Sequence, residues 1–159
     1  MKFETLIIGA GAAGMMCAAH AGPEVLVIDH AKAPGEKIRI SGGGRCNFTN
    51  MHTGPQNFIS NNSHFAKSAL KRYTQWDFLA LVESYGIAWH EKTLGQLFCD
   101  VSAKDIIAML LSEMDKAKAQ LWLQTSVEDI TYDDGRFIVR TNKDGRNITL
   151  DVKNLVVAC

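Results

Sequence analysis

The sequence predicts an α/β domain in which a parallel sheet is joined to an antiparallel β-meander. Two apolar runs rich in β-branched residues, 3–8 and 24–28, flank an Ala- and Met-rich stretch at 12–21, which is the pattern of a strand, a helix and a second strand. Further along, three strand-like segments are separated by Asp134-Gly135 and Asp144-Gly145, which are typical hairpin-turn pairs. With 159 residues, of which 47% are hydrophobic, the chain can bury one core.

The strand–helix–strand unit implies two parallel strands connected by a right-handed crossover. The next stretch, His30 to Ser63, has no clean period and is rich in Gly, Asn, Ser and Thr, so it predicts a long loop with at most one short strand or turn. Gly86 is placed to cap a helix at its C-terminal end. Two helices and two short strands are expected here, at residues 64–73, 75–85, 88–92 and 96–99.

The second half of the chain contains the clearest helix pattern. Ser102 and Asp105 match a helix-capping box with Asp in place of Glu, and the apolar series after them predicts a helix to about Lys118. The meander strands are expected at 127–132, 136–141 and 147–152, and a separate buried strand at 154–159. Because no helix pattern follows that strand, we expect an interrupted doubly wound domain that is marginally stable or oligomeric on its own and turns over no substrate.

A glycine motif lies between the first strand and the first helix, Gly9-Ala-Gly11-Ala-Ala-Gly14. Gly9 permits a tight turn, Gly11 allows a pyrophosphate to approach the backbone, and Gly14 permits close packing of helix on strand. Asp29 follows about 20 residues after Gly9, at the end of the second strand, where a carboxylate accepts hydrogen bonds from ribose hydroxyls. The motif predicts a Rossmann-like dinucleotide site that includes Gly9, Gly11, Ala12, Ala13, Gly14, Asp29 and His30.

The carboxylate of Asp29 also limits which nucleotide fits. It would repel a 2′-phosphate, which disfavours NADP at this first site. It does not separate NAD from FAD, because both carry an adenosine ribose and a pyrophosphate.

A second glycine-rich segment, residues 35–50, is flanked by cations and amides. It offers backbone N–H groups and the Arg45 guanidinium to an anionic or acceptor-rich ligand. From the residues alone, a flexible loop with a solvated Arg45 is the alternative.

This segment resembles the BaiN-like or aminoacetone-oxidase-like bacterial NAD(P)/FAD-dependent oxidoreductases, whose hallmark is G-x-K-x-x-x-S-G-x-G-R-C-N-x-T-N. Three positions elsewhere in the chain depart from what is usual in this family: Gln96 replaces the usual Arg, Cys99 the usual Pro, and Cys159 a common Thr. The fixed hallmark positions are all present, as Gly35, Lys37, Ser41, Gly42, Gly44, Arg45, Cys46, Asn47, Thr49 and Asn50.

The resemblance implies a flavoprotein of the type with two dinucleotide-binding domains and FAD as the cofactor. Residues 1–159 would be the N-terminal part of its FAD/NAD(P)-binding domain, without the inserted substrate domain and the C-terminal FAD-binding segment. The flavin would carry the hydride, with NAD(P)H or oxygen as redox partner, so cofactor contacts are expected rather than a catalytic acid or base. Those implied contacts are Lys37, Ser41, Gly42, Gly43, Gly44, Arg45, Cys46, Asn47 and Val127.

The composition limits the classes of molecule that we expect as partners. Lys+Arg and Asp+Glu both number 17, and no basic run is visible, so we expect a small-molecule substrate, no nucleic acid and no membrane. The four cysteines lack metal or disulfide spacing and the histidines lack ligand spacing, so no metal and a cytoplasmic location are expected. A nicotinamide-dependent dehydrogenase and a non-catalytic nucleotide-binding fragment stay open as alternatives.

Overall fold

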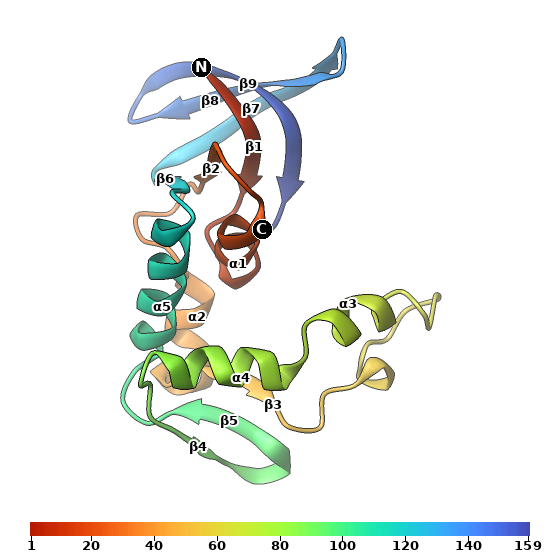
Figure 1. Ribbon diagram of the computed structural model, residues 1–159. Helices are drawn as coiled ribbons and strands as arrows, with labels where there is room; N and C mark the ends of the chain where they lie inside the picture. Colours follow the sequence, from red (N-terminus) through yellow and green to blue (C-terminus); the bar gives the residue numbers. More distant parts are fainter. The chain divides into compact units, whose positions relative to one another are not determined.

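A computed structural model describes residues 1–159, and the chain divides into two compact units (Figure 1). The first unit is made of Met1–Ile38 and Ile107–Cys159, and the second of Arg39–Ile106. No helix is both long enough and apolar enough to cross a membrane.

The first unit is built on a six-stranded sheet with the strand order β6-β2-β1-β9-β8-β7. The pairs β6–β2, β2–β1 and β1–β9 are parallel, whereas β9–β8 and β8–β7 are antiparallel. The predicted α/β class, with a parallel sheet joined to a meander, is therefore confirmed. The strands are β1 (Lys2–Ile8), β2 (Val25–Ile28), β6 (Gln120–Trp122), β7 (Thr125–Asp133), β8 (Arg136–Lys143) and β9 (Arg146–Val157).

Strand β9 belongs to both halves of the sheet, and this corrects one prediction. The strands expected at 147–152 and 154–159 form one strand of 12 residues. Its first part pairs with β8, and from Asp151 onward it pairs with β1. The physical reason is that no Gly or Pro stands between the two parts, so nothing in the sequence turns the chain there. Strand β6 was missed because three residues are too few to show a period.

One core cluster of this unit is made entirely of side chains from the sheet. Leu6, Leu26, Val139 and Leu150 are fully buried in one cluster that spans the parallel and antiparallel strands. Helix α1 (Ala12–His20) follows β1, as expected. The strong helix pattern after Ser102 is also confirmed, as α5 (Ala103–Lys116), and the Ser102 hydroxyl accepts a hydrogen bond from the Lys104 backbone N–H at 3.1 Å.

The meander turns have the conformation that their sequence requires. Asp134 and Gly135 have φ of +44° and +77°, and Asp144 and Gly145 have φ of +51° and +79°. Two successive residues with positive φ are the mark of a type I′ hairpin turn. The two Asp-Gly pairs therefore fix the register of β7, β8 and β9.

The second unit contains a small antiparallel sheet in the order β3-β5-β4. The region predicted as a long loop with room for one short strand contains β3, which forms by pairing with β5, a strand distant in sequence. It also contains the short helix α2, which was not predicted. A capping box found at Thr74 and Asp77 starts α4, where the Thr74 hydroxyl accepts from the Asp77 N–H. The elements are α2 (Glu36–Ile40, at the boundary of the units), β3 (Asn47–Asn50), α3 (Lys67–Arg72), α4 (Gln75–Ser84), β4 (Trp89–Glu91) and β5 (Gln96–Cys99).

The glycine turn after β1 yields a prediction about stability. A Cβ at Gly14 would lie 1.8 Å from the Gly9 carbonyl oxygen, whereas a Cβ at Gly11 would meet no atom within 4 Å. Gly14→Ala should lower the free energy of unfolding by about 3 kcal/mol, because backbone must move to relieve the overlap. Gly11→Ala, the matched control, should lower it by only about 1 kcal/mol or less, because Gly11 is the N-cap residue of α1 and Ala is a poorer N-cap than Gly. Urea unfolding of the cofactor-free proteins compares the two, and equal stabilities would contradict this packing.

Candidate functional site

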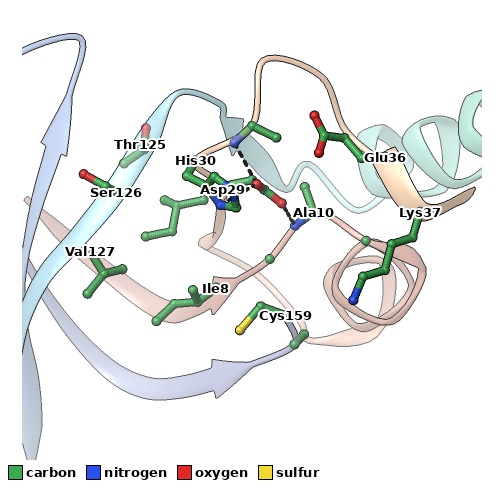
Figure 2. A pocket seen from close by; sticks show the side chains of 15 residues that line it. Ile8, Ala10, Asp29, His30, Glu36, Lys37, Thr125, Ser126, Val127 and Cys159 are labelled. Carbon is green, nitrogen blue, oxygen red and sulfur yellow. Dashed lines mark hydrogen bonds and ion pairs between the residues drawn. The ribbon is translucent and has the colours of Figure 1, made fainter. Parts of the chain in front are cut away.

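A pocket of the first unit opens at the carboxyl ends of β1, β2 and β9, beside the start of β7 (Figure 2). Ligands of open α/β sheets bind outside the carboxyl ends of the strands. The cavity volume of about 500 Å³ is in the range of cofactor sites. Its lining consists of Ile8, Gly9, Ala10, Gly11, Ile28, Asp29, His30, Ala31, Glu36, Lys37, Thr125, Ser126, Val127, Ala158 and Cys159.

The three motif glycines have different reasons to be glycine. Gly9 has φ of +112°, and a Cβ there would lie 2.8 Å from the Ala158 carbonyl oxygen, so only glycine allows the turn to pass so close to the end of β9. Gly14 is required by its approach to Gly9. Gly11 has an ordinary φ of −82° and open space where a side chain would stand. Neither backbone strain nor packing explains Gly11, which leaves access of a ligand to the backbone.

The N-terminal end of α1 faces this open space. Gly11 is the N-cap residue and has no side chain to cap the helix, and its carbonyl accepts the Met15 N–H at 3.0 Å. The first N–H groups of a helix have no partner within the helix, and the helix dipole is positive at this end. The turn therefore presents backbone donors suited to an anion such as a pyrophosphate.

Asp29 connects the two sides of the pocket. Its Oδ2 accepts the Ala10 N–H at 2.6 Å, and its Oδ1 accepts the Ala31 N–H at 2.9 Å. The sequence predicted that this carboxylate would accept from ribose hydroxyls. The structure shows that it also fixes the glycine turn against the segment after β2. A carboxylate offers about four lone-pair sites, so two remain for a ligand.

The rest of the pocket combines an apolar floor with two basic groups. Ile8 and Val127, both partly exposed, supply apolar surface, and the buried Ile28 also lines the pocket. Lys37 is exposed, makes no ion pair, and extends from α2 toward the pocket in Figure 2. His30 lies with its Nδ1 3.4 Å from Asp29 Oδ1. A flat apolar surface beside cationic and N–H donors suits a heterocycle joined to phosphates.

The structure brings together only part of the predicted site. Ala12, Ala13 and Gly14 lie in α1, immediately after the glycines that line the pocket. The stretch Ser41–Asn47 belongs to the second unit, so its role in cofactor binding stays a prediction. The predicted residues that line the pocket are Gly9, Gly11, Asp29, His30, Lys37 and Val127.

Sequence reasoning missed several lining residues, among them Glu36, Ala158 and Cys159. The last two follow β9, and the Ala158 N–H donates to the Ile8 carbonyl at 2.8 Å. Their signal was the apolar strand pattern before them, because residues after a parallel strand lie at the ligand-binding edge of a sheet.

The glycine run of the second unit forms a tight left-handed turn. Gly42, Gly43 and Gly44 have φ of +59°, +67° and +88°, and the Ser41 carbonyl accepts the Cys46 N–H at 3.0 Å. A Cβ at Gly42 would overlap the Phe98 ring, whereas one at Gly43 would meet nothing. Arg45 after the turn is exposed and forms no ion pair. The glycine run therefore has a defined turn geometry, while Arg45 is open to solvent, as the loop alternative expected.

Two buried cysteines stand beside this turn, Cys46 and Cys99, and the Cys99 N–H donates to the Arg45 carbonyl at 2.9 Å. Burial raises the pKa of the Cys46 thiol to about 11. Burial, with a smaller effect of the neighbouring Cys46, raises the pKa of Cys99 to about 12. Both side chains are therefore neutral thiols near pH 7. No group of three or more His, Cys, Asp or Glu side chains gathers as a metal site.

Comparison with known families identifies the family of this chain. The family model described as the HI0933-like protein Rossmann domain matches residues 3–159. The chain belongs to the HI0933-like Rossmann family. The Rossmann-like fold predicted from the glycine motif is thereby confirmed, whereas the finer likeness to BaiN-like or aminoacetone-oxidase-like enzymes stays a prediction.

Two curated relatives are named ribosomal RNA dihydrouridine synthase. The protein from Escherichia coli K12 is 50% identical over 161 residues, which cover 99% of this chain and 38% of that protein. The protein from Haemophilus influenzae is 49% identical, covering 98% of this chain and 39% of that protein. The chain thus spans less than two fifths of the length of these relatives.

Among solved structures, the chain is similar to a 3-ketosteroid-Δ4-(5α)-dehydrogenase from Rhodococcus jostii RHA1. The TM-score is 0.69 at 14% identity, and the match covers 98% of this chain and 45% of that one. At this identity the likeness concerns the fold, and it agrees with the α/β architecture of this HI0933-like chain.

The double role of Asp29 can be tested with Asp29→Asn. An amide places an NH₂ group against one of the two N–H donors that the carboxylate accepts, so the turn loses a charged hydrogen bond and about 2 kcal/mol of stability. Asp134→Asn is the control, because Asp134 is exposed in a turn that Asn tolerates equally well. Thermal unfolding measures both variants. An Asp29→Asn protein as stable as the control would exclude the bridging role.

The raised thiol pKa values of Cys46 and Cys99 give a second prediction. Alkylation requires the thiolate, so iodoacetamide near pH 8 should label both residues at least about a hundredfold more slowly in the folded protein than in urea. Labelling should speed up as pH rises toward 11. Mass spectrometry of the labelled peptides measures the rates, and fast labelling of folded protein at pH 8 would show that these thiols are accessible and ionised.

Proposed function

We propose that the pocket of the first unit binds FAD, and that the whole protein is a flavin-dependent oxidoreductase that reduces uridine in ribosomal RNA to dihydrouridine. The observation that carries the cofactor assignment is Gly11, whose backbone faces open space at the N-terminal end of α1. Nothing in the packing of the chain requires glycine there. A dinucleotide pyrophosphate does, because it needs direct contact with backbone N–H groups.

The donor set of the pocket fits the adenosine half of FAD. The turn Gly9 to Gly14 would hold the pyrophosphate, the free lone pairs of Asp29 would accept from the ribose, and the apolar surface of Ile8 and Val127 would take the adenine. Asp29 would repel a 2′-phosphate, which argues against NADP. The likeness of residues 35–50 to a flavoprotein hallmark favours FAD over NAD.

The substrate assignment rests on the two relatives named as ribosomal RNA dihydrouridine synthases, at 50% and 49% identity. Forming dihydrouridine saturates the C5–C6 double bond of uracil, which takes up one hydride and one proton. FAD supplies hydride chemistry when bound. The part of this chain is to bind and orient the cofactor through the pocket residues.

This proposal departs from the expected small-molecule substrate and from the expectation of no nucleic acid, which rested on the balanced charge of the whole chain and on the absence of a basic run. We also propose, from the same relatives, that residues 1–159 are the N-terminal part of the cofactor-binding domain. An inserted substrate domain and a C-terminal segment would complete the fold. Reducing uridine consumes two electrons, so of the two expected redox partners NAD(P)H would supply them to the complete protein, and oxygen, an oxidant, could not.

Gly11→Val tests the cofactor assignment in the full-length protein. Its φ of −82° and the open space at its Cβ allow valine to fold, but the side chain would occupy the place of the pyrophosphate. The variant should purify without the flavin absorbance at about 450 nm, and its thermal unfolding should resemble that of the apoprotein. Ala108→Val, at an exposed position on α5 that does not line the pocket, should keep its flavin.

A folded Gly11→Val protein with one FAD per chain would overturn the cofactor site. The substrate is tested separately, by mass spectrometry of nucleosides from ribosomal RNA of cells that lack the gene. Dihydrouridine should disappear and return with the wild-type gene but not with Gly11→Val. Unchanged dihydrouridine in the deleted strain would overturn the RNA assignment while leaving FAD binding intact.

A further inference from the structure

The charge of the chain is distributed very unevenly, which the balanced total conceals. Residues 39–76 contain Arg39, Arg45, Lys67, Lys71 and Arg72 and no acidic residue, so all 17 Asp and Glu side chains lie elsewhere. This stretch belongs to the second unit. A local excess of cations attracts polyanions whatever the net charge of the whole protein is.

Within this stretch, residues 56–76, here called the exposed segment, are unusually open to solvent. Every residue from Gln56 to Phe65 is exposed, and only Ala66 of the whole segment is buried. In Figure 1 the loop and α3 extend beyond the N-terminal end of α4. Apart from Ala66, no side chain of the exposed segment is buried in a core, so its side chains are available to a partner.

The cations of the exposed segment have no partners inside the protein. Lys67 and Lys71 are four residues apart on α3 and share one face of that helix, and Arg72 ends it. All three are exposed, and none takes part in an ion pair. Desolvating them therefore breaks no existing ion pair, which favours binding to phosphates.

Aromatic rings stand on both sides of these cations along the exposed segment. Phe65 is 53% exposed and Trp76 is 49% exposed. Phe58 packs edge-on against Phe65 with ring centroids 6.4 Å apart, and both keep open ring surface. Exposed rings beside cations are the composition of surfaces that bind single-stranded nucleic acid, where bases stack on the rings and phosphates meet the cations.

We infer that the exposed segment is a docking surface for single-stranded RNA. The inference rests on the proposed function, which it deepens by placing RNA contacts on the second unit. A bilayer surface fits less well, because α3 has six residues and is too short for an amphipathic membrane helix. The absence of acidic side chains over residues 39–76 likewise favours a polyanion over a protein partner of mixed charge.

The test is binding of a fluorescent oligouridylate of about 16 nucleotides to the full-length protein, across a series of salt concentrations. Lys71→Gln with Arg72→Gln should weaken binding and reduce the slope of log affinity against log salt by about 0.7 for each phosphate that is no longer neutralised. The matched control is Lys118→Gln with Arg146→Gln, which removes one exposed Lys and one exposed Arg, neither ion-paired, from the first unit. The control should leave affinity and slope unchanged.

Stacking is tested at Phe65. Phe65→Ala should weaken binding about tenfold, and Phe65→Tyr should keep wild-type affinity because it preserves the ring. Flavin content is measured on every variant and should not change. Equal affinities of the Lys71/Arg72 variant and its control, or undiminished binding by Phe65→Ala, would overturn the RNA surface. Binding of anionic phospholipid vesicles but not RNA would do so as well.

These outcomes separate the two proposals. RNA binding that weakens in the Lys71/Arg72 and Phe65→Ala variants of a protein that purifies without FAD would support the surface and contradict the proposed cofactor. Full flavin content with RNA binding unaffected by any of the substitutions would support the cofactor and contradict the surface.

Discussion

The carboxylate of Asp29 connects the chain segments that form the pocket. Two segments that are distant in sequence, the glycine turn at Ala10 and the chain after β2 at Ala31, both donate a backbone N–H to it. Further backbone bonds extend this connection, since the Asp29 N–H donates to Trp122 and the Asp29 carbonyl accepts from Thr125. β1, β2, β6 and β7 are thereby joined around one residue. Its charge balances the unpaired donors of a turn that has no capping side chain.

Much of the fold could be predicted because its signals are local. The strand–glycine–helix pattern from Lys2 to His20 and the two Asp-Gly turns depend on a few adjacent residues, and each was identified correctly. The errors fall where structure depends on distant pairing. Strand β6, which was missed, forms by pairing with β2. Strand β3, a short strand that the loop prediction allowed for but did not locate, forms by pairing with β5. Neither segment has a period of its own that a sequence could display.

In the candidate site too, some residues could be predicted from local signals and others depend on distant pairing. The residues of the glycine turn, with Asp29, were predictable from spacing, since phosphate binding at a helix N-terminus imposes it. Ala158 and Cys159 were indicated only by the apolar strand pattern before them, and their place beside Ile8 follows from β9 pairing with β1 across almost the whole length of the chain. The net charge of the whole chain is a poor guide to nucleic-acid binding. Electrostatic attraction acts over roughly a Debye length of about 10 Å, so the distribution of charge matters more than its sum.

The dual pairing of β9 has a consequence for how the protein folds. Lys2 pairs with Asp151 and Ile8 with Val157, so the parallel half of the sheet closes only after the chain has been made as far as β9. The meander, in contrast, consists of local hairpins that form quickly. During synthesis on the ribosome, the edge of β1 that later pairs with β9 therefore stays unpaired until β9 has been made. Once the meander has formed, the first half of β9 is held against β8, and this places the second half of β9 beside β1 and completes the sheet.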